Sequence, residues 1–175
     1  MNKLYILSSL LLFIGGQLSG QEVSGQETAT PVVDKTNRII LHFKDTTGLF
    51  TALARILIDR GHDIEYKDRE FGILRTKPGT VPGGHSYNDQ MEVKTIFRDS
   101  TITFSSVVHS LAFFGDYQIK SHYELMFTKN RKNITNLPWT ELMQITGLLK
   151  PVSVTYQTVV TLKPYTFSGY IKPPK

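Results

Sequence analysis

Histidines and carboxylates are the side chains of this chain best suited to metal binding or acid–base catalysis. The five histidines are His42, His62, His85, His109 and His122. A zinc site built on a helix usually has two histidines four residues apart, often within an H-E-x-x-H pattern, and no pair in this chain has that spacing. We therefore expect no metal site. Each histidine is interpreted as a surface residue of a strand or loop.

Acidic residues form a second candidate group, because five of them surround one predicted hairpin: Asp59, Asp63, Glu65, Asp68 and Glu70. Paired carboxylates serve acid–base chemistry when one of them is removed from water. Here basic residues lie between the acidic ones, which is typical of a solvated surface. The chain also lacks the G-x-S-x-G and S-x-x-K patterns of serine enzymes. We expect no catalytic residues.

The segment 79–86 has the glycine spacing of a phosphate-binding loop but not its lysine. That loop needs a lysine on the phosphates and the N-terminus of a helix behind it. In this chain His85 takes the place of the lysine, and a strand pattern follows. The segment is therefore interpreted as a hairpin loop, and no cofactor is predicted.

Hydrophobic periodicity predicts the elements that position these side chains. Residues 39–43 alternate as in a strand, and apolar residues at helical spacing between 49 and 57 predict a helix that ends at Gly61 and is capped by Thr46 or Thr47. Alternation at 62–67 and 71–76 then predicts a hairpin that turns at residues 68–70. This first half reads as a strand, a helix and two antiparallel strands.

The second half continues with a hairpin of strands 91–97 and 102–108 and a long strand over 117–127. Asn136 or Thr135 opens a second helix, in which Trp139, Leu142, Ile145 and Leu149 share one face and which Pro151 ends. The fold class is therefore α+β. We expect a mainly antiparallel sheet of about five strands with two helices on one face, in the order strand, helix, four strands, helix.

The run His62–Thr76, placed directly after a strand and a helix, resembles small exported bacterial domains with a TATA-binding-protein-like fold. These domains include uncharacterised secreted proteins of Gram-negative bacteria and, more distantly, the soluble domains of an outer-membrane assembly lipoprotein. The glycine at Gly72 and the Trp-x-Glu-Leu helix at Trp139–Leu142 match their pattern, over about residues 38–150. The resemblance implies a TATA-binding-protein-like fold in the bacterial envelope. It carries no general catalytic residues.

The N-terminus predicts export. Residues 1–20 have the positive start, short apolar run and small polar end of a signal peptide, and the run is too short to span a bilayer. Residues 21–37 read as a polar linker, 38–150 as a single domain, and 151–175 as an extended tail or an edge strand. The chain has no cysteine, so it lacks the lipid-modified cysteine of the lipoprotein members. We expect a soluble periplasmic or extracellular protein without a transmembrane span in the mature chain.

Composition and aromatic residues indicate the kind of partner. The net charge is +5, but lysines and arginines are spread along the chain, so we expect no nucleic-acid binding. The tail residues Tyr165, Phe167 and Tyr170 have no evident core of their own, and His42 and His122 lie opposite the main apolar series of their strands. These five are the candidate partner-binding residues.

Three functions remain open from the sequence. The first is a secreted, non-catalytic envelope module that binds a protein partner through a sheet face or edge. The second is a carrier of a small apolar ligand in a cavity lined by Phe50, Leu53, Phe97 and Phe104. The third is an enzyme of an unrecognised class. The sequence leaves the identity of the partner and the oligomeric state undetermined.

Overall fold

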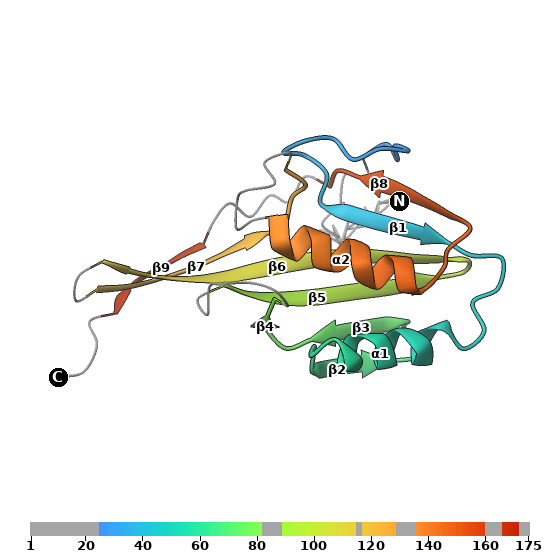
Figure 1. Cartoon of the computed structure of the whole chain (residues 1–175), viewed down its shortest axis with the longest axis horizontal. Coiled ribbons are helices and arrows are strands. Elements are labelled where there is room, and N and C mark those ends of the chain that lie inside the picture. The colour runs from blue at the N-terminus through green and yellow to red at the C-terminus, as the bar shows by residue number, and fades with distance from the viewer. Residues whose placement is uncertain (1–24, 82–88, 115–116, 129–135, 160–165, 172–175) are drawn as a thin grey trace, which may run out of the picture.

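The computed structural model describes residues 25–81, 89–114, 117–128, 136–159 and 166–171, which form two helices and one antiparallel sheet of nine strands (Figure 1). The elements follow one another as β1 (Arg38–His42), α1 (Leu49–Asp59), β2 (Ile64–Asp68), β3 (Ile73–Thr76), β4 (Gly79–Thr80), β5 (Asp89–Arg98), β6 (Thr101–Phe114), β7 (Tyr117–Glu124), α2 (Asn136–Leu148), β8 (Ser153–Gln157) and β9 (Thr166–Ile171).

The long strand β6 organises the sheet. The main strand order is β2-β3-β5-β6-β1-β8, so β5 pairs along one edge of β6. On the other edge, β1 pairs with Thr101–Phe104 and β7 pairs with Val107–Phe114. Strand β9 adds to β7, and the three strands β6, β7 and β9 extend away from the helices as an arm (Figure 1).

Both helices cover the same face of the sheet, α1 over β2 and β3 and α2 over β1 and β6 (Figure 1). Alternate residues of the strands point into this layer, as the period of two requires. The fully buried members of the core include Ile39, Leu41, Leu53, Leu57, Leu74, Met91, Val93, Ile102, Phe104, Val108 and Ile145. Neither of the two helices in the described residues covers the opposite face of the sheet.

Helix α1 begins and ends on glycines. Its N-cap is Gly48, at φ 77° and without a side-chain cap, so the predicted capping by Thr46 or Thr47 is wrong. At the other end Gly61 has φ 84°, and the backbone N–H of His62 donates to the carbonyl of Leu57 at 2.8 Å. This is the left-handed glycine termination that the sequence predicted.

The turn between β2 and β3 is longer than the sequence predicted. Strand β3 begins at Ile73 rather than at Phe71, because Gly72 adopts a left-handed φ of 63° that ends the alternation. A Cβ at this position would lie 2.7 Å from the carbonyl oxygen of Phe97, so the turn packs directly on the backbone of β5. As a result Phe71 points outward and is 69% exposed.

The predicted α+β class with an antiparallel sheet and two helices is confirmed. The expected number of about five strands is wrong, since nine are present in the described part of the chain. The additional strands include β4 from the predicted loop and β8 and β9 from residues 151–175, which pair with β1 and β7. Within the segment predicted as a linker, Thr28 forms a bridge with Tyr156.

None of the helices in the described ranges is long and apolar enough to cross a membrane.

Candidate functional site

His42 and His122 share the uncovered face of the sheet but lie far apart on it. His42 is opposite Thr101 and His122 is opposite His109, two positions that point to the same side of β6. These positions are separated by eight residues, or roughly 26 Å along the strand. The two predicted residues therefore do not form one site.

Each of these histidines has neighbours of its own. His42 Nε2 lies 2.8 Å from Thr155 Oγ1 and 3.6 Å from Glu27 Oε2, so it contacts the segment that precedes β1. The ring of His122 lies 6.1 Å from that of His109, whose Nε2 is 3.5 Å from Glu92 Oε2. Nowhere in the described ranges do three histidine or acidic side chains converge as a metal site requires.

The predicted aromatic residues of the tail are only partly described. Tyr165 lies outside the described residues, and of Phe167 and Tyr170 only the backbone is described. In strand β9, Phe167 pairs with Ser121 and Tyr170 with Ile119. The tail thus runs beside the strand that carries His122, while the binding role of its aromatic side chains stays a prediction.

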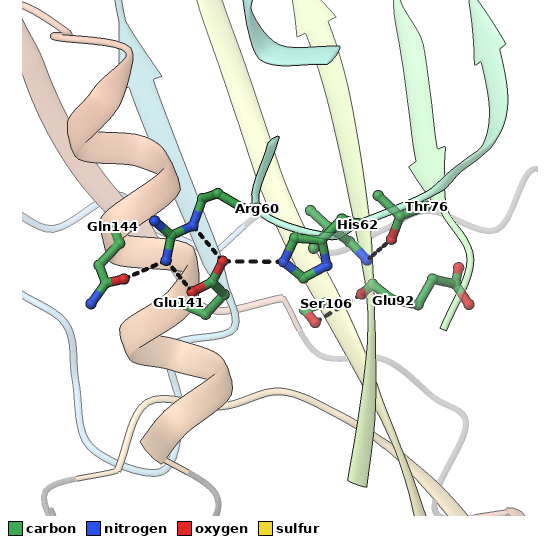
Figure 2. A network of polar contacts seen from close by, with 8 residues as sticks. Arg60, His62, Thr76, Glu92, Ser106, Glu141 and Gln144 are labelled. Carbon is green, nitrogen blue, oxygen red and sulfur yellow. Dashed lines mark hydrogen bonds and ion pairs between the residues drawn. The ribbon is translucent and has the colours of Figure 1, made fainter. Parts of the chain in front are cut away.

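A buried polar network joins the two helices (Figure 2). The guanidinium of Arg60 donates to both carboxylate oxygens of Glu141, at 2.6 and 2.5 Å, and also to Gln144. His62 Nε2 lies 3.1 Å from Glu141 Oε1. Arg60 is the C-cap residue of α1, His62 follows the terminating glycine, and Glu141 lies in the middle of α2.

The network is closed to solvent at its centre. The side chains of His62 and Glu141 are 0% and 3% exposed, whereas Arg60 is 23% exposed and its partner Gln144 lies at the surface. His62 Nδ1 has no hydrogen-bond partner among the described residues. The expectation that His62 is a surface residue is therefore wrong. Because no solute reaches His62 or Glu141 in this conformation, the network acts as a structural clamp between α1 and α2.

The clamp predicts a pH dependence of stability. Burial alone would raise the pKa of Glu141, but hydrogen bonds from Arg60 and His62 outweigh it and hold that pKa below its ordinary value of 4.5. A carboxylate with a depressed pKa stabilises the fold above its unfolded-state pKa, and this stability is lost as the pH falls through the folded-state pKa. Below about pH 4.5, we expect urea unfolding to show a steeper loss of stability in the native protein than in Glu141→Gln.

The control for this experiment is Glu65→Gln, which alters a half-exposed carboxylate paired with Arg75 at 3.0 Å. It should keep most of the native acid dependence, because exposed ion pairs contribute little. Equal pH profiles for the native protein and Glu141→Gln would contradict the role given to Glu141.

A cleft of about 350 Å³ opens at the start of α1, between the β2–β3 turn and the β5–β6 turn. The left-handed Gly48 brings the first turn of α1 to its edge, and the close packing of Gly72 on Phe97 forms its opposite side. Its lining residues are Thr46, Gly48, Phe50, Thr51, Arg69, Glu70, Phe71, Gly72, Phe97 and Asp99.

The cleft combines aromatic rings with charges of both signs. The rings of Phe50 and Phe97 lie 5.1 Å apart, and the guanidinium carbon of Arg69 lies 5.7 Å from the centre of the Phe50 ring. Arg69 also donates to Thr51 Oγ1 at 2.8 Å. Within the described part of the chain, no ion pair involves Arg69 or the two carboxylates of the lining. Such a surface can hold an apolar group at its centre and polar groups at its rim.

The cleft is only partly the cavity that the sequence predicted. Phe50 and Phe97 line it, whereas Leu53 and Phe104 are fully buried in the core and do not. Sequence reasoning missed Arg69, Phe71 and Asp99, because all three were assigned to a regular strand or to solvated turns. The only available signal was Gly72, whose place in the hairpin was noted but whose left-handed φ was not foreseen.

Comparison of the chain with protein-family models, with curated proteins and with solved structures finds no match in any of the three. The basis for a functional proposal is therefore the geometry of the cleft.

Proposed function

We propose that this protein is an exported, non-catalytic envelope module that binds a protein partner, and that the cleft beside α1 holds a bulky apolar side chain of that partner. The observation that carries the proposal is Phe71, a 69% exposed phenyl ring at the edge of a cleft that already contains Phe50 and Phe97. Aromatic residues and arginine are the side chains enriched in the energetically dominant centres of protein interfaces.

Phe71 is held outward by its own turn. The backbone N–H of Phe71 donates to Asp68 Oδ1 at 3.0 Å, and the carbonyl of Gly72 accepts from the Phe97 N–H at 2.7 Å. These two hydrogen bonds fix the backbone on both sides of Phe71 and keep its ring pointing outward. Burying a phenyl ring contributes roughly 1.5–3 kcal/mol. Because the Phe71 ring is mostly exposed in this turn, most of that stabilisation is not gained on folding. A partner that covers the ring would gain it on binding.

A carrier of a small apolar ligand is the second candidate, and the cleft volume of about 350 Å³ favours it. This volume is at the low end of the roughly 300–1,000 Å³ of small-molecule sites. The polar residues of the lining, Thr46, Thr51, Arg69, Glu70 and Asp99, fit a side chain of a polypeptide better than a wholly apolar molecule. The enzyme alternative has less support, because the buried histidine and glutamate of the clamp are closed to solutes.

The fold family and the location belong to the same proposal. The five strands β2-β3-β5-β6-β1 lie side by side, α1 follows β1, and α2 comes after the last long strand. This arrangement supports a TATA-binding-protein-like domain. Export is supported by Lys3 and the apolar run that follows it, in residues outside the described part of the chain.

Random peptides displayed on phage and selected on the full chain test the proposal. We expect the selected peptides to share a large apolar anchor residue, because the centre of the cleft is aromatic. Phe71→Ala should then weaken their binding at least about tenfold, the loss typical of a central interface residue. Fluorescence anisotropy with a labelled peptide measures the dissociation constants.

The matched control is Val152→Ala, which removes a 62% exposed apolar side chain outside the cleft. Its affinity for the peptides should equal that of the native chain. The proposal fails if Phe71→Ala and Val152→Ala bind equally well, or if no common apolar anchor emerges.

A further inference from the structure

The surface around the cleft contains both a projecting apolar side chain and an apolar hollow that could receive one. Phe71 projects from the β2–β3 turn, and the hollow beside it is lined by Phe50 and Phe97. A two-fold axis brings the same patch of two chains together, so such a contact requires that the patch be complementary to itself. A projecting ring next to an aromatic hollow meets this requirement in shape.

The charges of the patch are also complementary to themselves. Arg69 provides a cation and Glu70 and Asp99 provide two carboxylates, all on the lining of the cleft. Arg69 contacts only the neutral Thr51 hydroxyl and the Phe50 ring among the residues described, so its charge has no counter-ion there. In a two-fold contact, the Arg69 of each chain can face a carboxylate of the other, and both pairs form at once.

The patch is accessible to a second chain. Strand β2 lies at the end of the main strand order, and its Tyr66 is 46% exposed. Phe97 and Asp99 belong to the β5–β6 end of the sheet, whereas the arm formed with β7 and β9 extends from the opposite half of β6. The arm thus extends away from α1 and from the β5–β6 turn, the two elements that border the cleft (Figure 1).

We infer that the partner bound by the cleft is a second copy of this chain. The two copies form a symmetric dimer in which Phe71 of each enters the cleft of the other and Arg69 of each faces Glu70 and Asp99 of the other. This inference rests on the proposed function, because it assigns the occupant of the same cleft. A small interface of this kind gives a weak dimer that depends on protein concentration.

Sedimentation equilibrium of the full chain tests the dimer directly, at protein concentrations from about 1 μM to about 1 mM. We expect a monomer–dimer equilibrium whose dissociation constant rises at least about tenfold in Phe71→Ala and is unchanged in Val152→Ala. Circular dichroism verifies that each variant keeps the native fold, which is expected because both side chains are exposed.

Exchanging the charges across the interface distinguishes a specific contact from non-specific association. In a dimer of Arg69→Glu chains, like charges lie opposite each other, and the same holds for a dimer of the double variant Glu70→Arg with Asp99→Asn. Asparagine is chosen at position 99 because it tolerates the positive φ of 45° there. Each of these two proteins should be monomeric by itself. Their mixture should form a heterodimer in native mass spectrometry, because one of the two symmetry-related contacts keeps the native pairing of Arg69 with Glu70 and Asp99 and the other forms an ion pair of reversed polarity.

A native chain that remains monomeric throughout this range overturns the inference, and so does a mixture that gives no heterodimer. Peptide binding distinguishes this failure from that of the proposed function. If the monomeric chain still binds the selected peptides in a Phe71-dependent manner, the cleft serves another protein. If neither association nor peptide binding depends on Phe71, both proposals are wrong.

Discussion

Glu141→Ala is expected to lower the free energy of unfolding by about 3 kcal/mol, near the lower end of the 3–5 kcal/mol typical when one partner of a buried ion pair is removed. The carboxylate is almost fully buried and receives three hydrogen bonds from Arg60 and His62. Without it, His62 keeps both ring nitrogens in the core without a partner. Arg60 recovers some hydration because it is partly exposed, which is why we expect the lower end. Urea denaturation measures the effect.

The control distinguishes the clamp from ordinary surface pairs. Glu65→Ala removes a carboxylate of the Arg75 ion pair, whose two side chains are 43% and 45% exposed, and should cost less than about 1 kcal/mol. Replacing the whole clamp, as Arg60→Met with His62→Leu and Glu141→Leu, should restore much of the stability lost in Glu141→Ala, since no charge is then left unpaired. A loss in Glu141→Ala no larger than that in Glu65→Ala would contradict the clamp.

Helix α2 shows what hydrophobic periodicity can and cannot predict. Trp139, Leu142, Ile145 and Leu149 were placed on one face from their spacing, and all four are buried. Glu141 is equally buried, although a glutamate is expected to point outward. It lies four residues before Ile145 and three after Pro138, so spacing alone would have placed it inward. Only the partners that reach it from the end of α1 make that position favourable.

The sheet shows a similar limit. The hairpins of β2 with β3 and of β5 with β6 were predicted, because adjacent strands joined by short turns leave a local signal. The pairings of β1 with β6, β1 with β8 and β7 with β9 join segments distant in sequence. Alternation tells which face a residue points to and not which strand lies beside it, so these pairings and the number of strands could not be predicted.

The part of the cleft formed by the β2–β3 turn was missed for a related reason. Phe71 follows the alternation of Ile73 and Arg75, which predicts a strand. The alternation ends because Gly72 packs on the backbone of Phe97, a contact between residues far apart in sequence. A glycine in a hairpin signals a close approach but not its direction. The sequence thus indicated where the backbone is unusual and not that a binding surface results.

Gly72→Ala is the second substitution with a large expected effect, a loss of about 3 kcal/mol in the free energy of unfolding. Its φ of 63° costs a residue with a Cβ roughly 1–2 kcal/mol. The added Cβ would also lie 2.7 Å from the Phe97 carbonyl oxygen and 3.0 Å from the Phe97 Cβ, so backbone has to move. That movement weakens the 2.7 Å hydrogen bond from the Phe97 N–H to the Gly72 carbonyl. Urea denaturation gives the loss.

Gly48→Ala is the matched control, because Gly48 also has a left-handed φ, of 77°, but nothing lies within 4 Å of its added Cβ. It should show only the backbone cost of roughly 1–2 kcal/mol, and the difference between the two variants measures the contact with Phe97. Equal losses would mean that the turn can shift without cost. Because the same contact holds Phe71 at the edge of the cleft, Gly72→Ala should also weaken Phe71-dependent association under conditions where the variant is still folded.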